Sequence, residues 1–328
     1  MANQESKSTS LARRKLDFAP KSRGDKWFFR ATGFASYFAF VLVALVLIFL
    51  LVNAWPAIQD QGINFIIGSN WGAESKHPIM QLGPMLWGSI LIGFTGVVLA
   101  VPMAIAASYL IVFLLPKWAA KVATTVIDLL AALPSVVIGL WGLYVFMPVG
   151  MNWARIANQT LGWIPIFHVK NPDAAFVDSP FIAGWIVAVM IVPIITSVTR
   201  EIFSQMDDGL INGAVALGGS KLSVFSKVIL PTSASGIIGG VLLGLGRALG
   251  ETVAILYVLQ LSFNINFFSL LESRGGAVAS WILARFGEAT TVEFHGLMAA
   301  GLVIFLLTLL VNTLASIIVN RAQPWRKN

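Results

Sequence analysis

Six long apolar segments separated by polar connections dominate the pattern of this chain. They lie near residues 31–52, 85–114, 122–147, 181–199, 235–262 and 295–319. Each has roughly the 20 apolar residues that an α-helix needs to cross a bilayer. In the whole chain 57% of the residues are hydrophobic and only 11% are charged, against about 25% charged in a soluble protein. The pattern therefore predicts an all-α integral membrane protein with about six transmembrane helices.

The segment that precedes the first apolar run, residues 1–30, is polar, basic and rich in serine. The apolar run itself has no small-residue cleavage site, so we expect a retained span rather than a cleaved signal peptide. We therefore divide the chain into a basic tail over 1–30 and a transmembrane domain over 31–328.

Lys and Arg residues are distributed unevenly between the connections on the two sides of the predicted bundle. If the chain crosses six times, most of the 22 fall on the side of the two termini. The positive-inside rule places this side, with both termini, in the cytoplasm. The net charge of +7 then reflects topology and anionic lipid, and no nucleic-acid partner is expected.

Several kinds of chemistry are excluded by residues that the sequence lacks. It contains no cysteine, no Walker A sequence, no HExxH motif and no paired metal-binding histidines. Disulfides, thiolate sites, a bound metal and a bound nucleotide are therefore not expected, and any ATP dependence must come from another subunit.

The connection at 200–234, on the predicted cytoplasmic side, contains signals for a short helix. Asp207 and Asp208 are candidate N-caps, because an Asp side chain can accept from the free amides of a helix over 209–217. The pair Gly218-Gly219 then suits a helix C-terminus and a sharp change of direction.

A second short helix is predicted directly afterwards. Ser220 can cap it, it runs over 221–229, and Pro231 is expected to stop it. The two helices would form a hairpin, which either docks a soluble partner or lies on the lipid surface. The pattern alone leaves these two interpretations open.

One face of the first helix of this hairpin is apolar. Leu210, Ala214 and Leu217 share it by their i, i+4, i+7 spacing. If the hairpin docks a partner, this face is the expected contact surface.

The predicted span at 235–262 contains two charges, Arg247 and Glu251, one helical turn apart. A charge at bilayer depth is costly enough to indicate a functional site. Gly240 and Gly244 precede them on the same face, at spacings of four, three and four residues. Two interpretations remain. The charges form an ion pair that fixes helix packing, or the guanidinium binds an oxyanion and the glycines leave room for a solute.

The hairpin resembles the EAA loop of ABC importer permeases, whose pattern is E-A-A-x3-G-x9-I-x-L-P. The matching segment is Asn212-Gly-Ala-Val-Ala-Leu-Gly218, followed after nine residues by Val228-Ile-Leu-Pro231. Ala214, Gly218, Leu230 and Pro231 match, whereas Asn212, Gly213 and Val228 depart from the pattern. In such permeases this loop docks into the ATPase. The resemblance therefore implies a coupling role for Leu210, Asn212, Gly213, Ala214, Leu217, Gly218, Leu230 and Pro231.

The following run, Gly236 to Thr252, resembles the phosphate-import permeases of the PstC type. Leu133-Pro-Ser-Val-Val-Ile-Gly-Leu-Trp-Gly142 and Val192-Pro-Ile-Ile195 are similar to the same family. The resemblance implies a type I ABC importer permease fold and a role for Arg247 and Glu251 in phosphate passage. With the two glycines that precede them, these residues form the expected substrate pathway.

The same resemblance implies an assembly in the cytoplasmic (inner) membrane of a prokaryote. It would hold a second, PstA-like permease, a PstB-like ATPase dimer that binds ATP and Mg, and an extracytoplasmic PstS-like phosphate-binding protein. This chain would bind no cofactor and would not be an enzyme. The alternatives are a permease for another oxyanion, an ion-coupled secondary transporter, and a membrane scaffold without transport.

Overall fold

The computed structural model of the protein describes residues 23–75, 77–170, 176–264 and 269–322, with side chains up to residue 317. Most of the predicted basic tail, residues 1–22, lies outside the described residues. The chain separates into two units, Met1–Phe49 and Leu50–Asn328, which are described separately.

The described part of the first unit is the beginning of α1 (Arg23–Gln61). The helix starts at Arg23, so the end of the predicted tail is already helical. Up to Phe49 its side chains are mostly exposed and apolar, among them Phe34 and Phe40. Apolar residues on every face of a long helix are typical of a membrane span.

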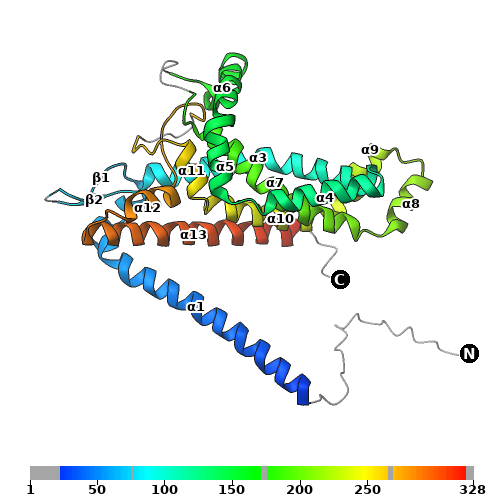
Figure 1. Ribbon diagram of the computed structural model, residues 1–328, viewed down its shortest axis with the longest axis horizontal. Coiled ribbons are helices and arrows are strands. Elements are labelled where there is room, and N and C mark those ends of the chain that lie inside the picture. The colour runs from blue at the N-terminus through cyan, green and yellow to red at the C-terminus, as the bar shows by residue number, and fades with distance from the viewer. Residues whose placement is uncertain (1–22, 76, 171–175, 265–268, 323–328) are drawn as a thin grey trace, which may run out of the picture. The chain divides into compact units, whose positions relative to one another are not determined.

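The second unit begins within α1, and its described residues form helices, three π-helical turns, a 3-10 turn and one short β-hairpin. In chain order these elements are α2 (Asn64–Ile67), β1 (Trp71–Gly72), β2 (Ile79–Met80), α3 (Gly83–Tyr109), η1 (Leu110–Leu114), α4 (Lys117–Ala131), α5 (Ser135–Trp141), η2 (Gly142–Phe146), α6 (Met147–Leu161), η3 (Pro165–Phe167), α7 (Pro180–Ser204), α8 (Asp208–Ala216), α9 (Lys221–Val224), η5 (Phe225–Ile229), α10 (Leu230–Leu249), α11 (Val253–Val258), α12 (Val278–Phe286) and α13 (Thr291–Ala322). Strands β1 and β2 pair antiparallel, with Trp71 opposite Met80. Figure 1 shows α3, α7, α10 and α13 side by side, with the β1–β2 hairpin at one end and α8 at the other.

Six helical stretches of the described chain are long and apolar enough to cross a membrane, as predicted. They cover 24–61, 83–114, 135–161, 180–204, 221–249 and 291–317. Four of them contain or overlap the predicted spans 31–52, 85–114, 181–199 and 295–319. The predicted spans 122–147 and 235–262 differ from the observed helices, and the second of them contains Arg247 and Glu251.

The predicted span at 122–147 is wrong as a continuous helix. Helix α4 ends at Ala131, and α5 begins at Ser135 directly after Pro134. Proline lacks an N–H and restricts the residue before it to extended conformations, so the α4 helix cannot continue through Leu133. The continuous apolar run therefore folds as two helices, and α5 turns away from the direction of α4 (Figure 1).

The predicted span at 235–262 is wrong at both ends, because the continuous helix runs from Lys221 to Leu249. Pro231 does not stop the short helix that precedes it. The π turn η5 lies directly before α10, with Leu230 N donating to Phe225 O. This π turn interrupts the regular i→i−4 hydrogen bonds of the helix. Pro231 lies directly after the interruption, in the first turn of α10, so its missing N–H removes no regular helical hydrogen bond.

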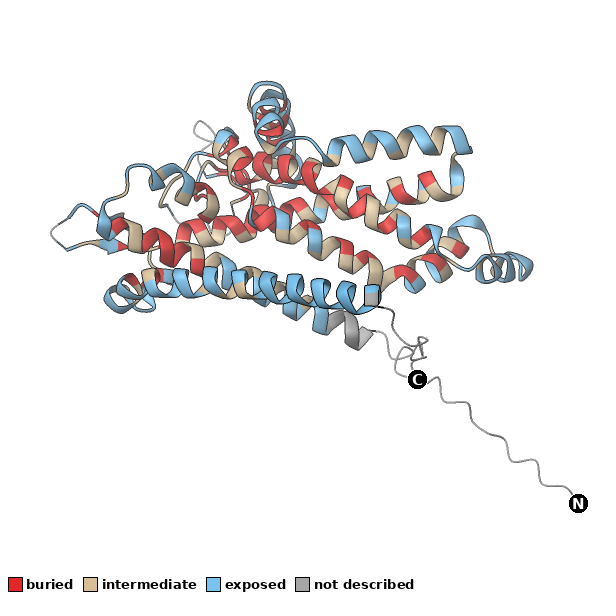
Figure 2. Cartoon of the chain, turned by 60° about the horizontal axis from the view of Figure 1, so that its bottom comes forward, coloured by how far each residue is buried: buried red, intermediate tan, exposed pale blue. Residues whose placement is uncertain are grey.

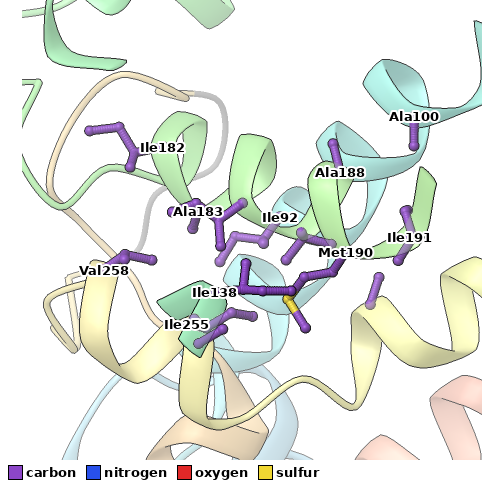
Figure 3. Packing of buried hydrophobic residues seen from close by; sticks show 14 of the residues in the cluster. Ile92, Ala100, Ile138, Ile182, Ala183, Ala188, Met190, Ile191, Ile255 and Val258 are labelled. Carbon is purple, nitrogen blue, oxygen red and sulfur yellow. The ribbon is translucent and has the colours of Figure 1, made fainter. Parts of the chain in front are cut away.

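Helix α7 forms the centre of the second unit and is the most buried of the six spans. Ile138 of α5 and Ile255 of α11 pack with Ile182 and Met190 of α7 in the main hydrophobic cluster (Figure 3). Figure 2 shows the buried residues concentrated on the inner helices and the exposed ones on the outer surfaces of α4 and α6. Most side chains on these outer surfaces are apolar, as expected for a protein surrounded by lipid.

Small residues bring α3 and α7 close together. A Cβ added to Gly184 would lie 2.6 Å from Thr95 Cγ2, and one added to Gly96 would lie 2.8 Å from Val187 Cγ1. Near the other end of the contact, Ser108 Oγ donates to Thr196 O at 3.0 Å. Close backbone approach with a polar interhelical bond is the usual way in which membrane helices associate.

Candidate functional site

Arg247 lies in the last turn of α10, and its side chain is exposed. Within the described residues, ion pairs of 4.0 Å or less join Arg274 to Glu272 and Arg285 to Glu293, and none involves Arg247. The structure thus contains a guanidinium in a membrane-spanning helix that no acidic side chain of the described chain neutralises. The interpretation of a resting ion pair with Glu251 is not supported by this geometry.

Glu251 is not on the same helix as Arg247, so the prediction of one continuous charged stripe is wrong. Helix α10 ends at Leu249, and Gly250 N donates to the carbonyls of Gly246 and Arg247. Glu251 follows this helix end, is only 8% exposed, and its Oε1 accepts from Ala254 N at 3.4 Å. The carboxylate therefore accepts from a free amide in the first turn of α11, as an N-terminal capping group does.

The two glycines that precede Arg247 pack against α7 and line no open space. A Cβ on Gly240 would lie 3.1 Å from Val198 Cβ, and one on Gly244 would lie 3.0 Å from Ile195 Cγ1. Of the two interpretations of these glycines, the structure supports close helix packing.

A different strip of α10 is open beside Arg247. Leu243 is 61% exposed, and an added Cβ on Gly239 would meet nothing within 4 Å. These residues lie four and eight positions before Arg247, so all three share one side of the helix. The i, i+4, i+8 spacing was visible in the sequence, but which side of the helix faces α7 was not.

The predicted caps and turn of the hairpin and its short first helix are confirmed at the far end of the bundle, but its second helix is not short, because it continues through η5 into α10. Asp207 caps α8, with Oδ1 accepting from Gly209 N at 2.8 Å, and Ser220 Oγ accepts from Ser223 N at 3.2 Å to cap α9. Gly218 has φ +82°, and its N–H donates to Val215 O at 2.9 Å. Only glycine adopts this φ readily, so the change of direction after α8 is specified by the sequence.

The predicted apolar docking face on α8 is wrong in composition. Ala214 is half-buried and packs inward with Ile211 against a cluster that includes Phe203. Leu217 is 92% exposed because α8 ends one residue earlier, at Ala216, and Leu210 is 49% exposed. On a helical wheel, Leu210, Ala214 and Leu217 share one face only if the helix continues through Leu217.

The other predicted coupling residues also divide into exposed positions and an inward-packed position. Asn212 and Gly213 are exposed on α8, and nothing lies within 4 Å of a Cβ added to Gly213. Gly218 and Pro231 are also exposed, whereas Leu230 packs inward. This end of the bundle therefore exposes large apolar side chains, Leu210, Leu217 and Leu222, among small and polar residues.

An aromatic cluster beneath α8 was not found by sequence reasoning. The ring centroids are 4.5 Å apart for Tyr109 and Phe225, 5.3 Å for Tyr109 and Phe113, and 5.9 Å for Phe113 and Phe203. The four rings join the ends of α3, η1, α7 and η5, and aromatic pairs at these separations stabilise each other beyond simple burial. Helix α8 is thus anchored on residues that belong to three different spans.

A buried ion pair holds the opposite end of the unit together. Glu293 accepts from Arg285 Nε at 2.8 Å, from Arg285 Nη2 at 3.1 Å and from Trp71 Nε1 at 3.0 Å. The hydrogen bonds that Arg285 donates to the Glu293 carboxylate raise the pKa of Arg285 above its ordinary value. Trp71 is 222 residues from Glu293 in sequence, and no local pattern indicates this contact.

The described chain is a bundle of membrane-spanning helices with a capped, exposed hairpin at one end, the arrangement of a multi-pass membrane protein. The sequence model of the family described as "Binding-protein-dependent transport system inner membrane component" matches residues 96–328, and the chain belongs to this family. The chain is accordingly a multi-pass membrane protein.

Two relatives are similar over nearly their whole length. The phosphate transport system permease protein PstC of Pasteurella multocida (strain Pm70) is 32% identical over 301 residues, which is 90% of this chain and 92% of the relative. The phosphate transport system permease protein PstC 2 of Mycobacterium tuberculosis (strain ATCC 25618 / H37Rv) is 34% identical over 302 residues, 92% of this chain and 93% of the relative. The predicted resemblance to PstC-type permeases is therefore confirmed.

Solved structures support the fold. The bacterial alginate ABC transporter, in complex with alginate pentasaccharide-bound periplasmic protein, is similar with a TM-score of 0.54 at 14% identity, over 92% of this chain and 95% of that chain. The inward-facing MetNI methionine ABC transporter is similar with a TM-score of 0.52 at 13% identity, over 74% of this chain and 95% of that chain. The predicted all-α, type I ABC importer permease fold is confirmed.

Proposed function

We propose that this chain is the permease subunit of an ATP-driven importer of inorganic phosphate, and that Arg247 binds the anion during passage. The observation that carries the proposal is an exposed Arg247 side chain, unpaired among the described residues, in a membrane-spanning helix. Guanidinium stays charged at physiological pH, and its planar donors match the oxygens of phosphate. The names of the similar PstC proteins support phosphate as the substrate.

The helix that contains Arg247 also supplies a mechanical connection. The span Lys221–Leu249 is continuous from the hairpin to Arg247. Arg247 follows Leu230 by 17 residues, or about 25 Å along the helix axis. A displacement of the hairpin therefore moves the anion site as part of the same rigid element, so this chain needs no nucleotide site of its own.

The proposed assembly includes a second, PstA-like permease, a PstB-like ATPase dimer that binds ATP and Mg, and a PstS-like phosphate-binding protein. The α8 hairpin would contact the ATPase from the cytoplasm, with both termini on that side of a prokaryotic inner membrane. Leu217, Leu210, Asn212 and Gly213 would face the ATPase, whereas Ala214 and Leu230 would anchor the hairpin on the spans. ATP binding would shift the hairpin, and access to Arg247 would alternate between the two sides.

The substitution Arg247→Gln tests this function in the complete complex reconstituted in liposomes. It removes the charge while the length and polarity of the side chain are nearly kept. We expect phosphate uptake to fall at least about tenfold, the loss of a charge-assisted hydrogen bond, while the ATPase still co-purifies. Arg155→Gln, on the exposed surface of α6, is the matched control and should transport normally. Normal uptake by the Arg247 variant would refute the anion site.

A further inference from the structure

Helix α4 presents a continuous apolar stripe to the exterior of the bundle. Trp118, Val122, Val126 and Leu129 are all exposed, Trp118 to 74%. Their spacings of four, four and three residues place them on one side of the helix, and we call them the α4 stripe. Ile127, on the other side, is partly covered, and α4 as a whole packs on α7. Because α4 is not among the membrane-spanning helices, the stripe is an apolar surface additional to those of the spans.

A cavity of about 290 Å³ opens at the end of this stripe, in the elbow between α4 and α5. The break at Pro134, which turns α5 away from α4, leaves this space between the two helices and α7 (Figure 1). Its lining is apolar and consists of Leu130, Leu133, Val137, Ile138, Trp141 and Val189. Leu133 and Val137 are exposed, whereas Ile138 is buried, so the elbow cavity is a notch that is open to the exterior.

The elbow cavity lies near the middle of the bilayer, on the side of α7 away from Arg247. Val189, which lines it, is the tenth residue of the 25-residue span Pro180–Ser204. Ile191, two residues further along α7, lies against Gly244 of α10. Two residues turn a helix by about 200°, so the cavity and α10 lie on opposite sides of α7. The cavity is therefore not part of the anion site on α10.

Two lysines lie at the other end of the α4 stripe. Lys117 and Lys121 are exposed and one helical turn apart, and neither forms an ion pair of 4.0 Å or less in the part of the chain that the structure describes. Lys121 precedes Leu130 of the elbow cavity by nine residues, or about 14 Å along the helix axis. One leaflet of the hydrocarbon core is about 15 Å thick. The lysines, with Trp118 beside them, therefore lie at the headgroup level when the cavity is at the centre of the bilayer.

The one acidic side chain of α4, Asp128, is turned away from the α4 stripe. It lies on the same flank of the helix as the lysines, seven residues after Lys121. Its Oδ1 accepts from Ser197 Oγ of α7 at 3.3 Å, so the carboxylate is directed toward α7. An apolar chain that follows the stripe from Trp118 to Leu129 thus does not cross a charged group.

The surface of α4 has the polarity profile of one membrane leaflet. From the α8 end inward it presents two cations, an indole ring, an apolar stripe and an apolar notch. Basic side chains at this level attract anionic lipid headgroups, and an acyl chain is complementary to the stripe and the notch. The volume of the notch is close to the lower limit of about 300 Å³ for small-molecule pockets, so it suits the end of an acyl chain. An apolar helix of another subunit would cover the stripe but would leave both lysines without a partner.

We propose that α4 and the elbow cavity form a binding site for an anionic phospholipid. Lys117 and Lys121 hold its phosphate, and one acyl chain follows the α4 stripe into the cavity. The chain fills the space that the break at Pro134 leaves, and so supports the angle between α4 and α5. The site lies on the side of α7 away from Arg247 and goes beyond the proposed function, because it does not depend on which solute is transported.

Photolabelling of the purified complex that contains this chain tests the site, in nanodiscs of phosphatidylcholine. Two probes are compared, phosphatidylglycerol and phosphatidylcholine, each with a diazirine near the end of one acyl chain. Mass spectrometry then measures the labelling of residues 130–141. We expect the phosphatidylglycerol probe to label this segment at least about fivefold more than the phosphatidylcholine probe, which is the gain from one lysine near an anionic lipid.

Two pairs of variants assign this labelling to the lysines and to the cavity. Lys117→Gln combined with Lys121→Gln should abolish the preference for phosphatidylglycerol, whereas Lys117→Arg combined with Lys121→Arg keeps both charges and should preserve it. Val137→Trp fills the cavity and should lower labelling by both probes. Val136→Trp, at the neighbouring exposed position, which is not among the residues that line the cavity, is its matched control and should leave labelling unchanged.

Three results would overturn the inference. Equal labelling by the two probes in the unaltered protein would show general contact with lipid and no headgroup site. A preference that survives the double glutamine substitution would show that the two lysines do not hold the phosphate. No labelling of residues 130–141 by either probe would show that another subunit covers the elbow. Arg247→Gln should leave the labelling unchanged, so failure of the anion site and failure of the lipid site are distinguishable.

Discussion

Removal of Arg285 should destabilise the protein far more than removal of Arg274, which also forms an ion pair. Glu293 is 0% exposed and accepts three hydrogen bonds, two from Arg285 and one from Trp71. The substitution Arg285→Met keeps much of the side-chain length but leaves a buried carboxylate with the Trp71 bond as its remaining side-chain contact. The loss of one partner of a buried ion pair costs about 3–5 kcal/mol. Because the Arg285 side chain is 30% exposed, we expect a value near the lower end, about 3 kcal/mol.

Arg274→Met is the matched control. Arg274 pairs with Glu272 at 3.0 Å, but its side chain is 45% exposed. Glu272 also accepts from Lys170 N at 2.9 Å, and this bond survives the substitution. Exposed pairs contribute about 0–1 kcal/mol, so the free energy of unfolding should change little.

The free energy of unfolding can be measured by titration of the purified protein with a denaturing detergent, followed by tryptophan fluorescence. Trp71 and Trp281 lie 5.6 Å apart by ring centroids, and Arg285 lies 5.9 Å from the Trp281 ring, so the signal reports on this cluster. The double variant Arg285→Met, Glu293→Leu should be more stable than Arg285→Met alone, because it removes the uncompensated charge. Equal destabilisation by the two arginine substitutions, or a less stable double variant, would refute the reasoning.

Two further predictions concern the coupling hairpin and the helix packing. Leu217→Asp should weaken co-purification of the ATPase at unchanged permease stability, because Leu217 is 92% exposed. Ala214→Asp should instead lower the stability of the permease itself, because Ala214 packs inward. If Leu217→Asp lowered stability and Ala214→Asp only weakened co-purification, the observed α8 geometry would be contradicted. Gly240→Val should cost about 1–3 kcal/mol of unfolding free energy by overpacking against α7, whereas Gly239→Val, where an added Cβ meets nothing within 4 Å, should be nearly neutral. Equal costs for the two valine variants would show that α10 does not pack as described.

Local signals in the sequence determined much of this protein. The apolar runs specified the number of spans and the positions of four of them, because a bilayer requires about 20 apolar residues per helix. Asp207, Ser220 and Gly218 specified the ends of the helices in the hairpin, because caps and positive φ values depend on the nearest residues. Arg247 was recognisable as a functional candidate because a charge in an apolar run is unusual in any fold.

Contacts between residues far apart in the sequence decided which faces of the helices are buried and which charged side chains are paired. The packing of α10 on α7 decides which face of α10 is buried. Gly240 and Gly244 therefore proved to be packing positions, and the open strip with Gly239 and Leu243 lies beside them. The end of α10 at Leu249 separated Glu251 from Arg247, although their spacing fits one helical turn. The pairing of Glu293 with Trp71 joins residues 222 positions apart. Periodicity shows which residues share a face of a helix, but only the tertiary structure determines what that face meets.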